Sequence, residues 1–312
     1  MRVIEAVDLT KSFGGSGSPP VLDGITLNIE AGEVFGYLGP NGAGKTTTIR
    51  VLLGLLRPTR GTVRVFGEIP AESDAIRSRI GVLMENSGLD ERMSAYQNLE
   101  YHARLYGLRD PRAKIERLLG FVGLDDKRNE KVGTFSTGMR RKLGLARAIV
   151  HDPELLFLDE PSAGLDPEAQ LMVRELLQEL AEARKITVFI NSHHLDEVQR
   201  LCSRIAVLHR GRIRANDTIA ALRQGAAAPR LEVRLSDERD AARAAELLSA
   251  EAQTATIART GATLTLSGNG SAAPEVIARL VHAGLRIEEV LRPAKSLEDV
   301  YFEIVRDEAV SA

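Results

Sequence analysis

One short segment limits the folds open to this chain more than any other part of it. Residues 39–46 read GPNGAGKT and fit the pattern G-x-x-x-x-G-K-[ST]. The apolar run VFGYL comes directly before this loop, and apolar residues recur at helical spacing after it, at Ile49, Leu52, Leu53 and Leu56. A strand, a glycine-rich loop and a helix in this order predict an α/β fold with the loop at the carboxyl edge of a parallel sheet.

The residues of this loop suit the binding of phosphate groups. Glycines let the backbone curl its N–H groups around phosphate oxygens, and the helix that follows directs its positive end at the same anion. Lys45 supplies a charge to the β- and γ-phosphates, and the Thr46 hydroxyl is a ligand for Mg²⁺. The predicted phosphate-binding residues are Gly39, Pro40, Asn41, Gly42, Ala43, Gly44, Lys45, Thr46 and Thr47.

Two carboxylates end a second apolar strand. The run LLFL at residues 155–158 is continuously apolar, as in a strand buried on both faces, and Asp159 and Glu160 follow it. Beside a phosphate loop, an aspartate at this place holds the metal ion, and Glu160 is placed to polarise an attacking water molecule. Without the phosphate loop, a solvated acidic pair would be the simpler interpretation.

A third strand, ITVFI at residues 186–190, leads to two histidines. His193 is able to contact a γ-phosphate or to hold Glu160 and a water molecule, although the residues alone do not separate it from His194. Lys45, Glu160 and His193 thus follow three different strands. Because ligands bind at the carboxyl edge of open α/β sheets, we expect these side chains to meet there.

The segment FSTGM, residues 135–139, begins another helix, which Ser136 is able to cap. With Gly138 it would form a second anion-binding helix end. From the residues alone, an ordinary helix cap followed by the basic surface residues 140–142 is the simpler interpretation.

Five motifs in order, GPNGAGKTT, FSTGM, LLFLDEP, SAGLDP and NSHH, resemble the ATP-binding subunits of ABC transporters. The resemblance covers residues 1 to about 220 and is closest in pattern to the daunorubicin-resistance-like drug exporters of bacteria and the A-type branch. It implies a P-loop ABC ATPase domain with an inserted helical subdomain, which binds ATP and Mg²⁺ and hydrolyses ATP.

The same resemblance implies that two subunits bury two ATP molecules between them. Ser136 and Gly138 of one subunit would contact the γ-phosphate held by the other subunit, and Asp166 would link the two sites. Phe13 stands where the family has an aromatic residue that stacks on adenine. His193, rather than His194, takes the catalytic role beside Glu160 and Lys45.

Three features depart from the common family pattern. The signature reads Ser-Thr-Gly-Met instead of Ser-Gly-Gly-Gln, a change seen in the drug- and lipid-exporter branch. Glu85 replaces the metal-binding glutamine; a glutamate is still a hard oxygen ligand, so the expected Mg²⁺ ligands are Thr46, Glu85 and Asp159. Phe13 is followed by a run of glycines and serines.

Patterning divides the chain into two domains. Residues 1–224 alternate strands and helices, apart from the helical subdomain at about 90–150, which opens with the capping-box pair Ser94 and Gln97. After a linker of small residues, the order βαββαβ predicts a small ferredoxin-like α+β domain over residues 229–312. A regulatory or dimer-supporting role and a purely stabilising one are both open for it.

The expected partners follow from what the chain lacks. No apolar run approaches the roughly 20 residues of a spanning helix, so transport requires separate transmembrane permease subunits. The 41 basic and 43 acidic residues are nearly balanced, which argues against nucleic-acid binding. We expect a homodimer in the cytoplasm, peripheral on the inner face of the cell membrane, that powers transport, with export favoured by the branch.

Three other functions share the phosphate loop. A soluble ABC-type ATPase that acts on nucleic acid or ribosomes would carry two cassettes, a long coiled coil or zinc motifs, and none is visible. A phosphate-loop kinase has no need of the signature and D-loop motifs. A nucleotide-gated scaffold without turnover would not need Glu160 and His193.

Overall fold

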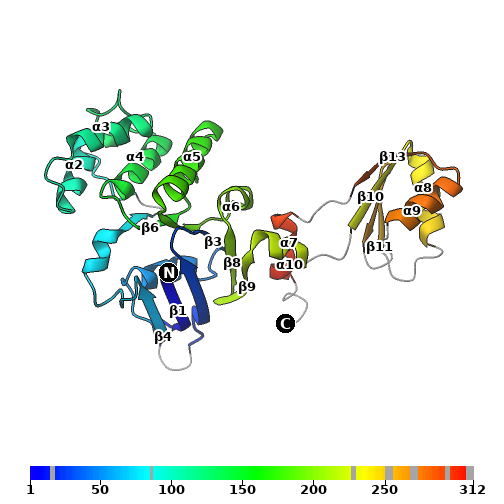
Figure 1. Cartoon of the computed structure of the whole chain (residues 1–312), viewed down its shortest axis with the longest axis horizontal. Coiled ribbons are helices and arrows are strands. Elements are labelled where there is room, and N and C mark those ends of the chain that lie inside the picture. Colours follow the sequence, from blue (N-terminus) through cyan, green and yellow to red (C-terminus); the bar gives the residue numbers. More distant parts are fainter. Residues whose placement is uncertain are drawn as a thin grey trace. The chain divides into compact units, whose positions relative to one another are not determined.

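The computed structural model describes residues 1–14, 18–84, 87–225, 230–249, 256–267, 273–291 and 296–306 (Figure 1). Glu85, a predicted Mg²⁺ ligand, therefore lies outside the described residues. The chain forms two compact units, one of residues 1–219 together with the chain from residue 304 onwards, and one of residues 220–303. The predicted domain limits of 1–224 and 229–312 stay a prediction. Within the described residues, no helix combines the length and apolar character needed to span a bilayer.

The first unit is built on a six-stranded sheet with the order β5-β6-β7-β3-β8-β9. All pairs are parallel except β8 with β9, which confirms the predicted α/β class. Every residue of β6 and β7 is buried, as the continuous apolar runs predict. The strand bounds are β3 Val34–Leu38, β5 Ile80–Leu83, β6 Leu155–Asp159, β7 Thr187–Asn191, β8 Arg204–His209 and β9 Arg212–Thr218.

A second, antiparallel sheet of this unit has the order β2-β1-β4, with β1 at Arg2–Lys11, β2 at Leu22–Glu30 and β4 at Arg60–Val65. A single hydrophobic core joins apolar residues of the two sheets, including the fully buried Ile4, Leu27, Phe35 and Phe157. Around the sheets lie α1 Lys45–Leu52, the short 3₁₀ helix η1 Ala75–Arg79, α5 Pro167–Arg184 and α6 Leu195–Leu201.

The predicted helical subdomain consists of α2 Ala95–Leu105, α3 Arg112–Phe121, the 3₁₀ turn η2 Val132–Thr134 and α4 Thr137–Ile149, which are grouped at one end of the first unit in Figure 1. The capping box of α2 is confirmed. The Gln97 backbone N–H donates to the Ser94 hydroxyl at 3.2 Å, and the Ser94 N–H donates to the Gln97 side chain at 2.8 Å. This reciprocal cap fixes where the inserted helices begin.

The second unit has a four-stranded sheet with the order β11-β12-β10-β13, all antiparallel. Its chain order, strand-helix-strand-strand-helix-strand, confirms the predicted ferredoxin-like α+β pattern. Apolar residues from the strands and both helices, Leu231 and Leu280 among them, form its own buried core. The bounds are β10 Arg230–Leu235, α8 Glu238–Ser249, β11 Thr256–Thr260, β12 Thr263–Ser267, α9 Ala273–His282 and β13 Ile287–Leu291; α7 Ile219–Gly225 and α10 Leu297–Arg306 flank it in the sequence.

Candidate functional site

The loop between β3 and α1 requires its glycines. Gly44 has φ +110°, and a Cβ atom there would lie 2.6 Å from Leu22 Cδ2. A Cβ atom on Gly39 would lie 2.3 Å from the Leu208 carbonyl oxygen. Gly42 has open space around it but a φ of +80°, which side chains rarely adopt. Close contacts thus require glycine at positions 39 and 44, and positive φ angles favour it at positions 42 and 44.

Lys45, the first residue of α1, lies in the mouth of this loop. Its Nζ donates to the carbonyl oxygens of Gly39 at 2.6 Å and Pro40 at 3.2 Å. Burial lowers the pKa of the Lys45 ammonium, and the charges of Glu160 and Asp159 oppose that shift. The ammonium of Lys45 is thus held by two neutral carbonyl oxygens, and an acceptor that carries a negative charge would bind it more strongly.

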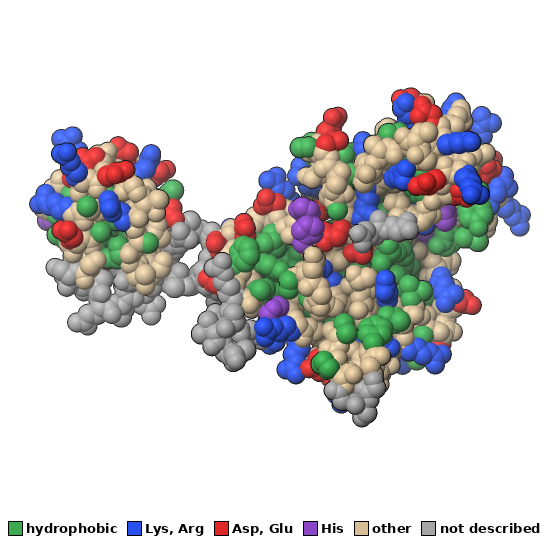
Figure 2. Space-filling view, turned by 180° about the vertical axis from the view of Figure 1, so that it is seen from behind, with side chains coloured by type: hydrophobic (Ala, Val, Ile, Leu, Met, Phe, Trp, Pro, Cys, Tyr) green, Lys and Arg blue, Asp and Glu red, His purple; other side chains and the backbone are tan. Residues whose placement is uncertain are grey.

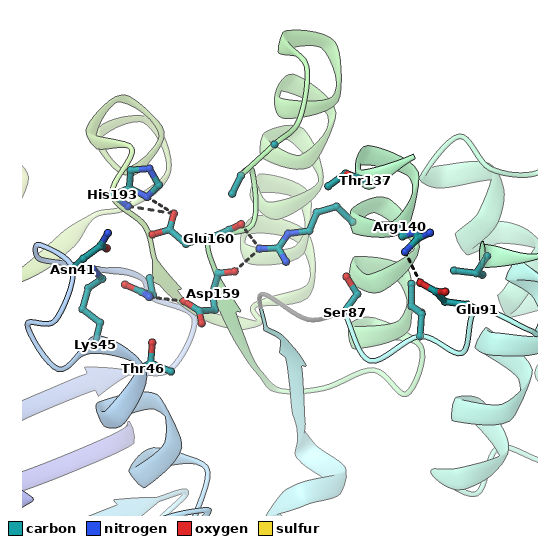
Figure 3. Close-up of a pocket in the computed structure, with 16 residues that line it drawn as sticks. Asn41, Lys45, Thr46, Ser87, Glu91, Thr137, Arg140, Asp159, Glu160 and His193 are labelled. Atoms are coloured by element: carbon teal, nitrogen blue, oxygen red, sulfur yellow. Dashed lines mark hydrogen bonds and ion pairs between the residues drawn. The ribbon is translucent and has the colours of Figure 1, made fainter. Parts of the chain in front are cut away.

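A pocket of about 750 Å³ joins this loop to the ends of the neighbouring strands. In Figure 3, Lys45, Asp159, Glu160 and His193 lie on one side of the pocket, and Thr137, Arg140 and Glu91 lie across from them. Because β6, β7 and β3 are adjacent, their carboxyl ends bring the carboxylates, the histidine and the lysine together. The fold therefore brings the ends of these three strands together, as expected from the sequence.

Asp159 ends β6 as a buried carboxylate, only 6% exposed. Its Oδ1 accepts a hydrogen bond from Asn191 Nδ2 at 2.5 Å, across the register pair at the end of β6 and β7. The exposed Thr46 lines the same pocket. A carboxylate and a hydroxyl in one polar pocket suit a hard cation such as Mg²⁺.

Glu160 adopts a left-handed backbone conformation, with φ +53°, which is uncommon for a residue with a side chain. Its N–H donates to the Asn191 carbonyl oxygen at 2.8 Å. The carboxylate Oε2 lies 2.8 Å from His193 Nδ1 and 3.4 Å from the His193 backbone N. The strained turn and these contacts fix the carboxylate beside the histidine.

Arg141 is a residue of the site that the sequence interpretation misses. The prediction of basic surface residues at 140–142 is wrong for Arg141, which is 6% exposed. From α4, its guanidinium donates to four backbone carbonyls, those of Met84, Asp159, Glu160 and Pro161. Helical spacing could have indicated that Arg141 is buried, because it places Arg141 on the same face of α4 as the apolar residues Leu145 and Ala148, which are also buried.

Glu197, on α6, is a second such residue. Its carboxylate accepts hydrogen bonds from the hydroxyls of Ser162 and Ser192, the latter at 3.0 Å. Ser192 in turn accepts from the backbone N–H of His194 at 3.0 Å. Glu197 therefore joins the loop that follows β6 to the loop that carries the histidines.

Six predicted residues of the phosphate loop, Gly39, Pro40, Gly42, Ala43, Gly44 and Thr47, are absent from the described lining of the pocket, and so are four predicted residues from elsewhere in the chain. Ser136 caps its own helix, its Oγ accepting from the Met139 N–H at 3.2 Å, and Gly138 lies in the first turn of that helix. Asp166 caps α5, accepting from the Ala169 N–H at 2.8 Å. Phe13 is 60% exposed, with Lys11 Nζ 5.2 Å from its ring centroid. Their predicted contacts with nucleotide stay predictions.

Comparison with known proteins shows which family this chain resembles. A family model described as ABC transporter matches residues 22–163. The daunorubicin/doxorubicin resistance ATP-binding protein of Streptomyces peucetius is 43% identical over 253 residues, which cover 80% of this chain and 76% of that protein. The bacitracin transport ATP-binding protein of Bacillus licheniformis is 42% identical over 212 residues, 68% of each chain. A solved ATP-binding subunit of an ABC transporter has a TM-score of 0.66 at 29% identity, covering 72% of this chain and 92% of that one.

Proposed function

This chain belongs to the ABC transporter family as an ATP-binding, ATP-hydrolysing subunit, and we propose that it powers export through separate membrane-spanning subunits. The observation that carries the proposal is the meeting of Lys45, Asp159, Glu160 and His193 in one pocket. These groups are a phosphate-binding cation, a metal-binding carboxylate, a base and its positioning partner.

The proposed chemistry begins with Lys45. Its ammonium exchanges the carbonyl oxygens of Gly39 and Pro40 for oxygens of the β- and γ-phosphates. The bonds to those carbonyls are lost, but bonds to phosphate join two charged groups and are stronger than bonds to neutral oxygens. The backbone N–H groups of the surrounding loop complete the cradle.

Glu160 polarises the water molecule that attacks the γ-phosphate in line. The contact with His193 Nδ1 at 2.8 Å supports this role, because it orients the Glu160 carboxylate toward the pocket. Arg141 holds the backbone on either side of the same carboxylate through the carbonyls of Asp159 and Pro161. Lys45 offsets the charge that develops on the phosphate oxygens.

Thr46 and Asp159 would hold Mg²⁺ in this pocket, with Glu85 as a third candidate. At these residues a bound Mg²⁺ would supply positive charge that offsets the charge of the phosphate groups. The oxygen donors of the two described residues support this assignment.

We further propose a head-to-tail dimer of identical subunits. Ser136 and Gly138 lie outside the pocket that contains Lys45 of the same chain. Thr137, which stands between them, does line that pocket, so the assignment of Ser136 and Gly138 to the ATP of another copy rests on the family resemblance. The start of α4 suits this contact, because its positive end and exposed Ser136 are free to face an anion. Asp166 and Phe13 keep their predicted roles in linking the two sites and in stacking on adenine.

Export is proposed from the relatives. Two proteins that are more than 40% identical to this chain serve daunorubicin/doxorubicin resistance and bacitracin transport. Acting through a permease would place the dimer on the cytoplasmic, inner face of the cell membrane. Transport through a permease needs no nucleic-acid surface, and on the face shown in Figure 2 basic and acidic side chains are interspersed among the described residues.

The proposal is tested by purifying the chain from membranes in mild detergent and identifying what accompanies it. We expect a multi-span membrane protein, together with ATP hydrolysis that depends on Mg²⁺. Recovery of ribosomes or DNA in place of a membrane protein would favour the soluble ATPase alternative and contradict the transport function.

A further inference from the structure

Three side chains with metal-binding atoms meet at the edge of the pocket. Glu160, His193 and His194 each offer one ligand atom, and these atoms all lie within 4.8 Å of one another. The two imidazole rings have centroids 4.2 Å apart. Figure 2 shows histidine and acidic side chains close together on the surface of the first unit. His194 has no role in the proposed hydrolysis, so its place in this cluster calls for a separate explanation.

The donor set selects one class of cation. Two imidazoles and one carboxylate form the ligand set of His₂Glu zinc sites, whereas Mg²⁺ and Ca²⁺ prefer oxygen donors alone. Bonds of about 2.0–2.1 Å in a tetrahedral site place ligand atoms roughly 3.3 Å apart. The separation of Glu160 Oε2 and His193 Nδ1 is 2.8 Å, so a small outward movement of the exposed His193 side chain from the half-buried Glu160 would admit an ion.

The backbone that carries these ligands is held in place. Glu160 is bonded to Asn191 through its N–H, and Arg141 binds its carbonyl oxygen. Ser192 accepts the His194 N–H and is itself bonded to Glu197. Only side-chain rotation is therefore needed to bring the three donors onto one ion.

We propose that Glu160, His193 and His194 bind a transition-metal ion of the Zn²⁺ class, and that the bound ion stops ATP hydrolysis. The inhibitory part rests on the proposed function. An ion here occupies the Glu160 oxygen and the His193 nitrogen, which are needed for the attacking water and the γ-phosphate. Three protein ligands leave a fourth position of a tetrahedral ion open to solvent or to an anion.

The binding part is tested by calorimetry on the full chain without an affinity tag and without nucleotide, titrated with zinc chloride. We expect one site per chain. Loss of an outer-shell partner alone costs 10–100-fold in metal affinity, so His194→Ala is expected to weaken binding at least about tenfold. His194 is exposed and makes no side-chain cap on α6, so its replacement leaves the fold intact. His282→Ala, in the second unit, is the matched control and keeps wild-type affinity.

The inhibitory part is tested by ATP turnover at saturating Mg²⁺ and ATP, with free zinc fixed by a metal buffer. Wild type and His194→Ala are expected to hydrolyse ATP equally without zinc, and the variant to need at least about tenfold more zinc for half inhibition. Equal zinc affinity in the two proteins, or full turnover by a zinc-loaded wild type, overturns the inference. If neither protein hydrolyses ATP without zinc, the proposed function and the inhibition both fail, while calorimetry still decides the metal site.

Discussion

Among single residues, Glu160 combines an uncommon backbone conformation with a close contact to an imidazole. Its backbone is in the left-handed region, and its carboxylate lies 2.8 Å from an imidazole nitrogen at the edge of the pocket. A strained conformation persists only where neighbouring contacts maintain it, and such residues are concentrated in functional sites. The proposed role of Glu160 as the base therefore leads to a direct test.

Glu160→Gln is expected to reduce ATP turnover by about 10²–10⁴-fold, the usual contribution of general base catalysis. Nucleotide binding should persist, because Lys45 and the glycine-rich loop are unchanged. Turnover is measured by phosphate release, and affinity by fluorescence of a labelled ATP analogue. Wild-type turnover in the variant would rule out Glu160 as the base.

Lys45→Ala is expected to weaken ATP binding. The charged hydrogen bonds of Lys45 to phosphate are worth about 1.5–3 kcal/mol, which corresponds to roughly a tenfold to hundredfold rise in Kd. Lys142→Ala, on α4, provides a control in which the charge change is the same. If the two variants bound ATP equally well, the loop between β3 and α1 would not be the phosphate site.

Much of the site could be predicted from the sequence, because a motif is recognisable where the backbone geometry allows only one or two residue types. Gly44 and Gly39 are such cases, since any side chain there meets neighbouring atoms. Arg141 and Glu197 could not be found this way. Their roles depend on carbonyls and hydroxyls of segments distant in the sequence, such as Met84 and Ser162.

At the scale of elements, Arg141 joins α4 to the ends of β5 and β6. Arg141→Met keeps an unbranched apolar stem similar to that of arginine but removes the donors to four carbonyls. Each carbonyl left buried and unpaired costs about 1–3 kcal/mol, so we expect a loss of at least about 2 kcal/mol in the free energy of unfolding. Urea denaturation measures this loss, and turnover should fall as well. A stability change within about 0.5 kcal/mol, as expected for Lys142→Met, would contradict the role of Arg141.

His102 on α2 and Arg147 on α4 predict that the free energy of unfolding depends on pH. Burial, followed by the charge of Arg147, lowers the pKa of His102 from 6.5 to about 4. Between these two values the unfolded chain binds more protons at this residue than the folded chain does, so the contribution of His102 to stability falls as the pH falls. His102→Gln should therefore lose less stability than wild type on acidification from pH 6.5 to about 4. Denaturation curves at several pH values measure this, and parallel losses in both proteins would refute it.

Individual helices and strands can be predicted from the sequence where a single kind of interaction determines them. Continuous apolar runs predict β6 and β7, and the capping pair Ser94 and Gln97 predicts the start of α2. The order of strands within a sheet is harder to predict from sequence, because β7 pairs with β3 although strands β4 to β6 and helices α1 to α5 lie between them in the chain. That order depends on packing across the whole sheet.

For the whole molecule, we propose that a second copy of the chain completes the site. One chain supplies the pocket with Lys45 and Glu160, while Ser136 and Gly138 lie outside it. A substitution at Gly138 would be accommodated in the single chain, because a Cβ atom there would have its nearest contact 3.5 Å away, at Leu165 Cδ2. An effect of such a substitution on assembly would therefore report on the interface and not on folding.

The measurement that tests this claim most directly is analytical ultracentrifugation of Glu160→Gln at saturating ATP and Mg²⁺. Because ATP is bound and not hydrolysed, the account predicts twice the mass of one chain with ATP and the mass of one chain without it. Adding Gly138→Asp, which places a negative charge opposite the γ-phosphate, should restore the single-chain mass. A single-chain mass for Glu160→Gln with ATP bound, or a dimer unaffected by Gly138→Asp, would contradict the account.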